Sequence, residues 1–412
     1  MAGYLQRNQT VHRLEPAQVE VAIPTHFAVI PVYDENEHIA NTLASIKRAL
    51  QYAPEPVKTV LVINHPLNAP EQSCRNNQTL LESLRKNDGQ YDGGLSVGED
   101  LFFIDLTVKE IPDKFRNVGN ARKTGFDEVI RQIDGKLTAR KVLLFSLDAD
   151  TLVAENYFSA AMEFNRTHPE AAGAVFHFEH RFESPDEAVN QAAVRYEIFL
   201  RDYAWQLRSC GSEFGFWTIG SAFMCNALDY MRCGGMRRNA AGEDFYFLQA
   251  LRKVGQLGVV PDTTVYPSGR ISFRVPFGTG PAISRQLSGS KLELYNPRCF
   301  AELKEFFAAV ASSSCEELSG SIMHLAGKRL AEYLEKFQFA DVWSRIVCNT
   351  PHRREALQHA LHVYCDGFFI LRFCHYLEQS YPQEYARIPF DPTTDSKEKL
   401  AQMRQRDRQQ LI

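Results

Sequence analysis

The sequence predicts an α/β fold, with a mostly parallel β-sheet covered by helices on both faces and an all-helical region after it. Two observations predict the sheet: short apolar, β-branched runs alternate with segments of helical periodicity, and these runs are apolar throughout. The third observation is that only helical patterns occur from about residue 290 onward. We therefore expect an α/β domain over 1–285 and a helical C-terminal region over 286–412, ending in a charged tail from Asp391.

Each element of the α/β domain follows from its local pattern. The run HFAVIPVY (26–33) predicts a strand, and apolar residues recur every three or four positions over 34–50, which predicts a helix. The segment 65–100 is polar and ends in a stretch rich in Gly and Asp, so we expect a mobile surface loop there. Further strands are expected at 57–64, 101–106, 141–147, 173–180 and 257–267, and further helices at 118–133, 155–167, 186–208 and 242–255.

The composition argues against several classes of protein. A formal net charge of -4, from 46 basic and 50 acidic residues, gives no bulk attraction to nucleic acid or to an anionic membrane. The nine cysteines include no C-x-x-C pair, which argues against a zinc knuckle and a disulfide framework. No apolar run approaches the ~20 residues of a membrane helix, and the N-terminus lacks the apolar stretch of a secretory signal. We expect a cytoplasmic protein; peripheral contact with a membrane stays open.

The stretch LLFSLDADTLV (143–153) ends a predicted buried strand on two carboxylates. In parallel sheets ligands bind outside the carboxyl ends of the strands, where Asp148 and Asp150 are expected to lie. Two carboxylates separated by one residue can share a divalent cation if the chain turns there, and such a cation neutralises a diphosphate. The alternative is that these acids only cap the helix that begins near Glu155.

A second acidic pair, Glu243 and Asp244, follows a glycine-rich stretch and precedes a helical pattern. One interpretation is an ordinary acidic start of a helix. The other is a carboxylate that removes the proton from an attacking hydroxyl group, which requires the acid within hydrogen-bond reach of that group.

Four motifs in order resemble the family 2 glycosyltransferases. VIPVYDENEHIANTLASI (29–46) is similar to the opening VIPVYNEE and the helix after it, and GNARKTG (119–125) is similar to G-x-ARN-x-G. LDADT (147–151) looks like the family's DxD strand end, and GSAFMCNALDYMRCGGM (220–236) with GEDFYF (242–247) looks like its G-S-x-F…GGF…ED block. The resemblance covers roughly residues 26–275. It implies the GT-A fold, a single Rossmann-like nucleotide-binding unit.

The resemblance implies a set of donor-binding residues. Arg122 would lie near the base or the diphosphate. Asp148 would face the ribose or the donor sugar, with Ala149 beside it. Asp150, together with Asp148, would hold Mn²⁺ or Mg²⁺ on the diphosphate of a UDP- or GDP-sugar. The residues expected to line the base and ribose are Pro31, Tyr33 and Glu35.

The resemblance also implies a reaction. Asp244 would be the general base of an inverting transfer to a hydroxyl acceptor, and Glu243 would touch the acceptor or the donor sugar. The acceptor would be a saccharide, a lipid-linked molecule or another small molecule. Because the Q-x-x-R-W motif of processive members is absent, a single addition is favoured. Two positions depart from the family pattern: Asn64 stands where a base-contacting aspartate is usual, and Lys123 replaces the asparagine of ARN.

The segment PSGRISFRVPFGTGP (267–281) follows the last predicted strand. Its glycines would let it close over a donor, and Arg270 and Arg274 would offer cationic contacts to phosphate. A polar connector to the helical region is the alternative.

Other interpretations stay open at this point. A haloacid-dehalogenase-type phosphatase also ends a strand in DxD, but its motif continues as DxDGT, whereas Thr151 comes one residue too early here. A catalytically silent GT-A-like binding protein is the other alternative. Whether the protein forms a homodimer through the helical region stays open as well. Phe216 and Trp217 are candidates for the acceptor face or for the core. The histidines of the helical region, at 352, 359, 362 and 375, are expected to be structural.

Overall fold

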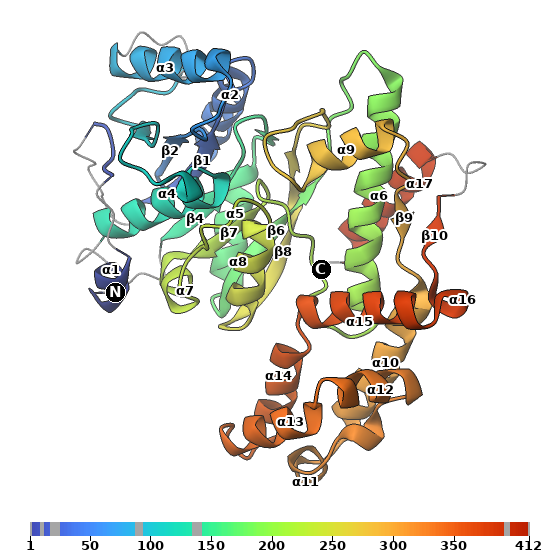
Figure 1. The fold of residues 1–412 in the computed structure, drawn as a ribbon. Helices are drawn as coiled ribbons and strands as arrows, with labels where there is room; N and C mark the ends of the chain where they lie inside the picture. Colours follow the sequence, from blue (N-terminus) through green and yellow to red (C-terminus); the bar gives the residue numbers. More distant parts are fainter. Residues whose placement is uncertain are drawn as a thin grey trace. The chain divides into compact units, whose positions relative to one another are not determined.

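The structure, a computed structural model, describes residues 2–8, 12–16, 25–86, 94–133, 142–390 and 396–410 (Figure 1). Its internal contacts divide the chain into two compact units. The first unit comprises Met1–Val194, Thr218–Ser288 and Ala401–Ile412, and the second comprises Arg195–Trp217 and Gly289–Leu400. The main division therefore falls between Ser288 and Gly289. Residues 195–217 precede this division but belong to the second unit, and residues 401–412 follow it but belong to the first.

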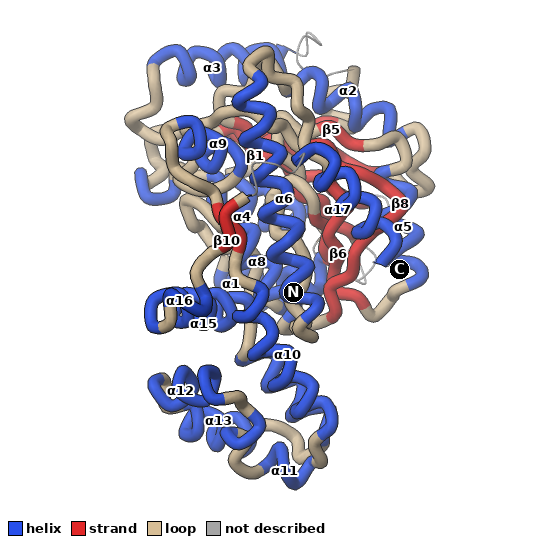
Figure 2. Tube along the Cα trace, turned by 90° about the vertical axis from the view of Figure 1, so that its right-hand side faces the viewer, coloured by secondary structure: helices blue, strands red, loops and turns tan. Residues whose placement is uncertain are grey.

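Within the described residues, eight strands of the first unit form one sheet in the order β3-β2-β1-β4-β7-β6-β8-β5. Pairs β1–β2, β2–β3, β1–β4 and β6–β8 are parallel, whereas β7 is antiparallel to both of its neighbours and β5 is antiparallel to β8. Figure 2 shows β5, β6 and β8 side by side. The predicted α/β class with a mostly parallel sheet is confirmed. The strands are β1 His26–Val32, β2 Val57–Ile63, β3 Leu101–Asp105, β4 Leu143–Ser146, β5 Leu152–Val153, β6 Ala171–Phe178, β7 Phe223–Asn226 and β8 Gln256–Tyr266.

Helices cover both faces of this sheet. A Cβ added to Gly125 of α4 would lie 2.4 Å from the Val29 side chain, so Val29 faces α4. Phe145 instead contacts Tyr157 of α5. The register pairs Val29 with Ser146, the residue after Phe145, and successive side chains of a strand point to opposite faces. Val29 and Phe145 therefore face opposite sides of the sheet, so α4 covers one face and α5 the other. The helices of this unit are α1 Ala2–Arg7, α2 Ile39–Leu50, α3 Glu71–Lys86, α4 Val118–Gln132, α5 Tyr157–Thr167, α7 Ala227–Arg232, α8 Glu243–Arg252 and α9 Thr279–Leu287.

One prediction about an irregular segment is wrong. The stretch expected to be a loop over 65–100 contains α3, whose apolar side, including Leu80 and Leu84, is buried. Its polar composition hides that narrow apolar side, and the buried Asn77 amide donates to the Asn64 carbonyl oxygen at 3.0 Å. The charged tail expected from Asp391 includes the helix α17, Ser396–Gln410, which is rich in charged residues; residues 391–395 lie outside the described part.

The second unit is helical, as predicted. Its core includes Leu303, Phe306, Trp343 and Phe373, each almost fully buried. Beside its helices, β9 (Glu293–Leu294) and β10 (Ile388–Pro389) form a short antiparallel pair. The chain first enters this unit within α6, Glu187–Ser209, and returns to the first unit after Trp217. It enters the second unit again at Gly289 and leaves it within α17. Its other helices are α10 Pro297–Ser312, α11 Cys315–Ser319, α12 Lys328–Lys336, α13 Phe339–Cys348, α14 Arg354–Tyr364, α15 Gly367–Ser380 and α16 Pro382–Tyr385.

The aromatic residues Phe216 and Trp217 are both buried. The guanidinium groups of Arg201 and Arg208 lie over the Trp217 ring, 5.6 and 5.3 Å from its centroid. These contacts agree with the core interpretation of Trp217. In the part of the chain that the structure describes, none of the helices combines the length and the apolar character needed to cross a bilayer.

Candidate active site

The residues predicted to bind a donor follow neighbouring parallel strands of the first unit. Tyr33 and Glu35 come directly after β1, Asn64 follows β2, and Asp148 and Asp150 follow β4. Because β1 is parallel to both β2 and β4, all of these residues lie at the same edge of the sheet. The fold alone therefore gathers them, before any side-chain interaction is considered.

A buried arginine links the two acidic pairs. Arg122 of α4 is 2% exposed, and its Nε donates to Glu243 Oε1 at 3.0 Å while its Nη2 is hydrogen-bonded to Asp148 Oδ1. Its Nη1 also donates to Ser146 Oγ at 2.6 Å. A guanidinium group remains charged when buried, so it needs such charge-assisted partners. The guanidinium group of Arg122 thus contacts both the predicted DxD motif, through Asp148, and the predicted acidic pair, through Glu243.

Asp244 lies beside this arginine. A Cβ added to Gly220 would be 2.6 Å from Arg122 Nη2 and 3.5 Å from Asp244 Oδ2, so only glycine leaves room between them. Burial raises the pKa of Asp244 to about 7, and the carboxylate of Glu243 adds to that rise. Burial also raises the pKa of Glu243, against the opposing attraction of Arg122. A carboxyl group with a pKa near neutrality is suited to accepting a proton.

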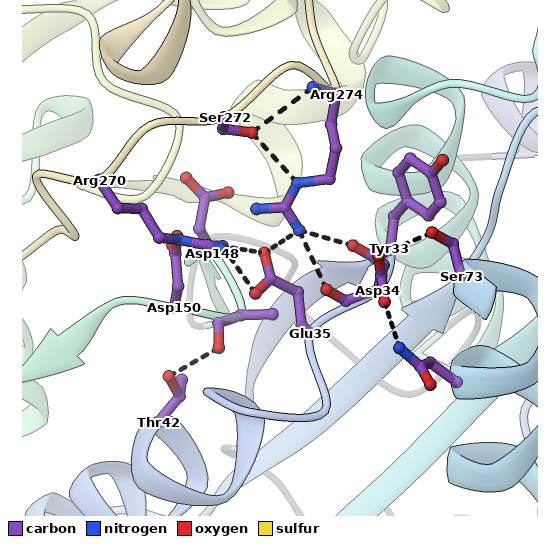
Figure 3. A network of polar contacts seen from close by, with 12 residues as sticks. Tyr33, Asp34, Glu35, Thr42, Ser73, Asp148, Asp150, Arg270, Ser272 and Arg274 are labelled. Atoms are coloured by element: carbon purple, nitrogen blue, oxygen red, sulfur yellow. Dashed lines mark hydrogen bonds and ion pairs between the residues drawn. The ribbon is translucent and has the colours of Figure 1, made fainter. Parts of the chain in front are cut away.

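A second ion cluster joins the loop after β8 to the ends of β1 and β4 (Figure 3). Arg270 Nε donates to Asp150 Oδ2 at 2.8 Å, and Arg270 Nη2 donates to both Glu35 oxygens at 2.7 Å. Arg274 Nη1 is also paired with Glu35, and it donates to the Tyr33 carbonyl oxygen at 2.6 Å. Burial raises the pKa of Glu35 to about 7, and Asp150 raises it further, whereas the two guanidinium groups lower it.

The segment 267–281 is thus held against the site in this structure. Arg274 Nε also donates to Ser272 Oγ at 3.2 Å, which keeps this arginine folded back along its own loop. Two large side chains of the same loop, Phe273 and Phe277, are 83% and 65% exposed. The loop therefore contacts the site through its arginines and presents its aromatic rings to solvent.

Of the other predicted residues, Tyr33 joins the second cluster only through its carbonyl oxygen, and Pro31, Asn64 and Ala149 lie outside both clusters. Pro31 is buried within β1 opposite Val62, and Tyr33 is half-buried. Asn64 is 5% exposed. Ala149 is also buried, and its carbonyl oxygen accepts from Thr42 Oγ1 at 2.8 Å, which fixes the turn between the two aspartates.

The carboxylates suit a hard divalent cation. Among the described residues, Asp148 is hydrogen-bonded through Oδ1 and Asp150 through Oδ2, so the second oxygen of each carboxylate can bind a cation. The side chains of Asp148 and Asp150 are 37% and 18% exposed. Among the described residues no three His, Cys, Asp or Glu side chains gather as a metal site. If a divalent cation binds here, Asp148 and Asp150 are the protein ligands expected from the sequence, and substrate and water would supply the others, an arrangement common for Mg²⁺.

Sequence reasoning missed three residues that shape this site. Ser146 Oγ accepts from Arg122 and donates to the Gly220 carbonyl oxygen at 2.6 Å. Arg181 Nη2 donates to the Asp150 carbonyl oxygen at 2.8 Å. Asp34 has a φ of 57° and accepts from Ser73 and Asn76 of α3 at 2.7 Å each. A polar residue inside the apolar strand LLFS was a usable signal for Ser146; the other two depend on contacts distant in sequence.

The comparisons with known proteins give matches to solved structures, at low sequence identity in the two described here. No protein-family model and no curated protein sequence matches this chain. Among solved structures, residues 1–349 of S. aureus TarS in complex with UDP are 12% identical, covering 78% of this chain and 90% of that one with a TM-score of 0.40. Mannosyltransferase PcManGT from Pyrobaculum calidifontis in complex with GDP-Man and Mn²⁺ is also 12% identical, covering 81% and 85% with a TM-score of 0.37. At such low scores, a functional proposal has to come from the site itself.

Proposed function

We propose that the protein is a GT-A-type glycosyltransferase of the family 2 kind. It transfers one sugar from a nucleoside-diphosphate sugar to a hydroxyl acceptor, with inversion at the transferred carbon. The motifs in the sequence suggest this class. One observation in the structure carries the proposal: Asp148 of the DxD motif, Glu243 and the partly buried acid Asp244 lie around the same buried arginine, Arg122.

That juxtaposition supports two roles at neighbouring positions. Asp148 and Asp150 end a strand at the sheet edge where α/β folds bind ligands, so the donor's diphosphate would lie over them. Asp244 lies beside Arg122 as well, and it would meet an acceptor hydroxyl group that approaches the transferred sugar. Because Arg122 already compensates Asp148 and Glu243, Asp244 is the acid of this group whose raised pKa fits proton transfer.

The proposed chemistry is a single displacement. The acceptor oxygen forms a bond to the anomeric carbon while the bond between that carbon and the diphosphate oxygen breaks. The bonding electron pair leaves with the diphosphate, and the acceptor's proton passes to Asp244. Attack on the face opposite the leaving group inverts the configuration at the carbon.

Two features of the chain would stabilise the departing diphosphate. Mn²⁺ or Mg²⁺ held by Asp150 and Asp148 would supply Lewis-acid neutralisation of the charge that develops there. Arg270 and Arg274 are the nearby guanidinium donors, and guanidinium groups bind phosphate through paired hydrogen bonds. In this structure both arginines bind Glu35, and Arg270 also binds Asp150. A donor would have to draw them from carboxylate to phosphate.

A donor panel tests the proposed function. We expect the protein with Mn²⁺ to release nucleoside diphosphate from one of the UDP-, GDP- or dTDP-sugars, slowly with water and faster with the correct acceptor. Release is measured by a coupled phosphate assay on the liberated diphosphate. A folded protein that neither binds nor cleaves any donor of the panel contradicts the proposal, and it favours the silent binding protein instead.

The pH dependence of transfer follows from Asp244. A general base accepts a proton only in its deprotonated form, and the pKa of Asp244 is raised to about 7. We therefore expect kcat/KM to rise with increasing pH, with an apparent midpoint near this value. Measured kcat/KM that is flat from about pH 5.5 to about pH 8.5 would contradict a base with this pKa.

A further inference from the structure

A cysteine and a histidine of the second unit contact each other away from the proposed active site. Cys315 is the first residue of α11, and His352 lies between α13 and α14. The Cys315 Sγ and His352 Nδ1 atoms are 3.6 Å apart, within hydrogen-bond distance for sulfur. The other ring nitrogen of His352, Nε2, lies 2.7 Å from Ser319 Oγ. A thiol, an imidazole and a hydroxyl group are therefore connected in a row.

The hydrogen bonds of Ser319 determine which nitrogen of the ring carries the proton. Ser319 Oγ donates its single hydrogen to the Cys315 carbonyl oxygen at 2.7 Å. The hydroxyl oxygen can then only accept from His352, so Nε2 carries the ring proton. In the neutral ring this leaves Nδ1 with its lone pair, directed at the Cys315 thiol. Transfer of the thiol proton to Nδ1 gives a thiolate beside an imidazolium ion.

His352 contacts the Cys315 sulfur directly, and charged residues adjoin both of them in the sequence. Two acids, Glu316 and Glu317, follow Cys315, and two bases, Arg353 and Arg354, follow His352. Glu317 is used in the cap of α11, where its carboxylate accepts from the Ser314 backbone at 2.7 Å. Arg354 is hydrogen-bonded to the Ala311 carbonyl oxygen. These four side chains adjoin the pair in the sequence, whereas the imidazole is in direct contact with the sulfur.

The other histidines of this unit have different partners. His359 lies 3.6 Å from Glu213, and His362 stacks on Phe307. His375 lies 3.2 Å from the Tyr295 hydroxyl. The structural role expected for all four histidines suits these three, whereas His352 is exposed and contacts a partly exposed thiol.

We infer that Cys315 is a nucleophilic thiol activated by His352, and that it is a covalent modification site for low-molecular-weight disulfides. The thiolate sulfur attacks one sulfur of the disulfide, so a Cys315 mixed disulfide forms as the original S–S bond breaks. The departing sulfur takes the electron pair as a thiolate and can receive the proton from His352. A nucleophile, a base and a group that orients the base are the parts that such activation requires.

The test is competitive labelling of the intact protein. An aromatic disulfide, 5,5′-dithiobis(2-nitrobenzoate), is added in limiting amount near neutral pH, and the modified cysteines are identified by peptide mass spectrometry. We expect Cys315 to react at least about 10-fold faster than Cys74, because a free thiol is mostly protonated at this pH. Cys74 has the same intermediate exposure and serves as the internal reference.

Matched variants separate activation from simple exposure. His352→Gln is expected to lower the Cys315 rate to within about 2-fold of the Cys74 rate, whereas His359→Gln should leave it unchanged. Ser319→Ala frees the imidazole tautomer and is expected to have an intermediate effect. The inference is overturned if Cys315 reacts no faster than Cys74, or if His352→Gln leaves its rate unchanged while circular dichroism shows an intact fold.

Discussion

Replacement of Asp244 with asparagine is expected to reduce sugar transfer by about 10²- to 10⁴-fold, the contribution typical of a positioned general base. Asparagine keeps the shape of the side chain but cannot accept the proton of the acceptor hydroxyl group. Donor affinity should stay within about 2-fold, because the proposed donor contacts are at Asp148, Asp150 and the loop arginines. The measurements are steady-state transfer rates and donor affinity by calorimetry.

Two controls make this result specific to Asp244. Asp262→Asn changes an exposed acid of β8 outside both ion clusters and should leave transfer unchanged. Glu243→Gln removes the partner of Arg122 instead of the base, so transfer should fall but still rise with pH, with the midpoint moved to lower pH because Glu243 no longer raises the pKa of Asp244. Equal transfer by wild type and Asp244→Asn would remove Asp244 from the mechanism.

Replacement of Arg122 with methionine is expected to lower the free energy of unfolding by about 3 to 5 kcal/mol, as for a broken buried ion pair. Methionine fills a similar volume but leaves Glu243, which is 5% exposed, without its cation. It also removes the donor to Ser146 Oγ, a hydroxyl group that is fully buried in β4. Urea unfolding followed by circular dichroism measures the change.

A double variant tests the physical reason for that loss. In Arg122→Met/Glu243→Gln the unpaired carboxylate is replaced by a neutral amide, so the protein should regain a substantial part of the lost stability. Glu243→Gln alone should cost less than Arg122→Met alone, because Arg122 retains Asp148 and Ser146. Strictly additive losses in the double variant would show that the interaction between Arg122 and Glu243 contributes little to stability.

The sequence was sufficient to predict six of the eight described strands of the sheet and the strand ends of the site, but not the short strands β5 and β7. Apolar runs are local signals, and the register of a parallel sheet brings the residues after β1, β2 and β4 to one edge. The positions of Asp148 and Asp150 at a strand end therefore followed from the pattern LLFSLDAD. The helix α3 did not, because its buried leucines lie among polar residues such as Asn76 and Asn77.

The ion pairs were beyond sequence reasoning. Arg270 was predicted as a phosphate contact, but its bonds to Asp150 and Glu35 join residues 120 and 235 positions apart. Arg122 was likewise predicted near the donor, whereas its place between Asp148 and Glu243 depends on how α4 and α8 pack. Partners at such separations are set by the tertiary fold, and no local pattern records them.

The central claim is that Asp150 helps to hold a divalent cation on the diphosphate of a donor. Thermal unfolding of wild type and Asp150→Asn, each with UDP or GDP and with or without Mn²⁺, tests it most directly. Binding to the folded state raises the midpoint of unfolding. We predict that one nucleotide stabilises wild type much more with Mn²⁺ than without it, and that Asp150→Asn loses this difference. An equal Mn²⁺-dependent rise in both proteins would contradict the claim.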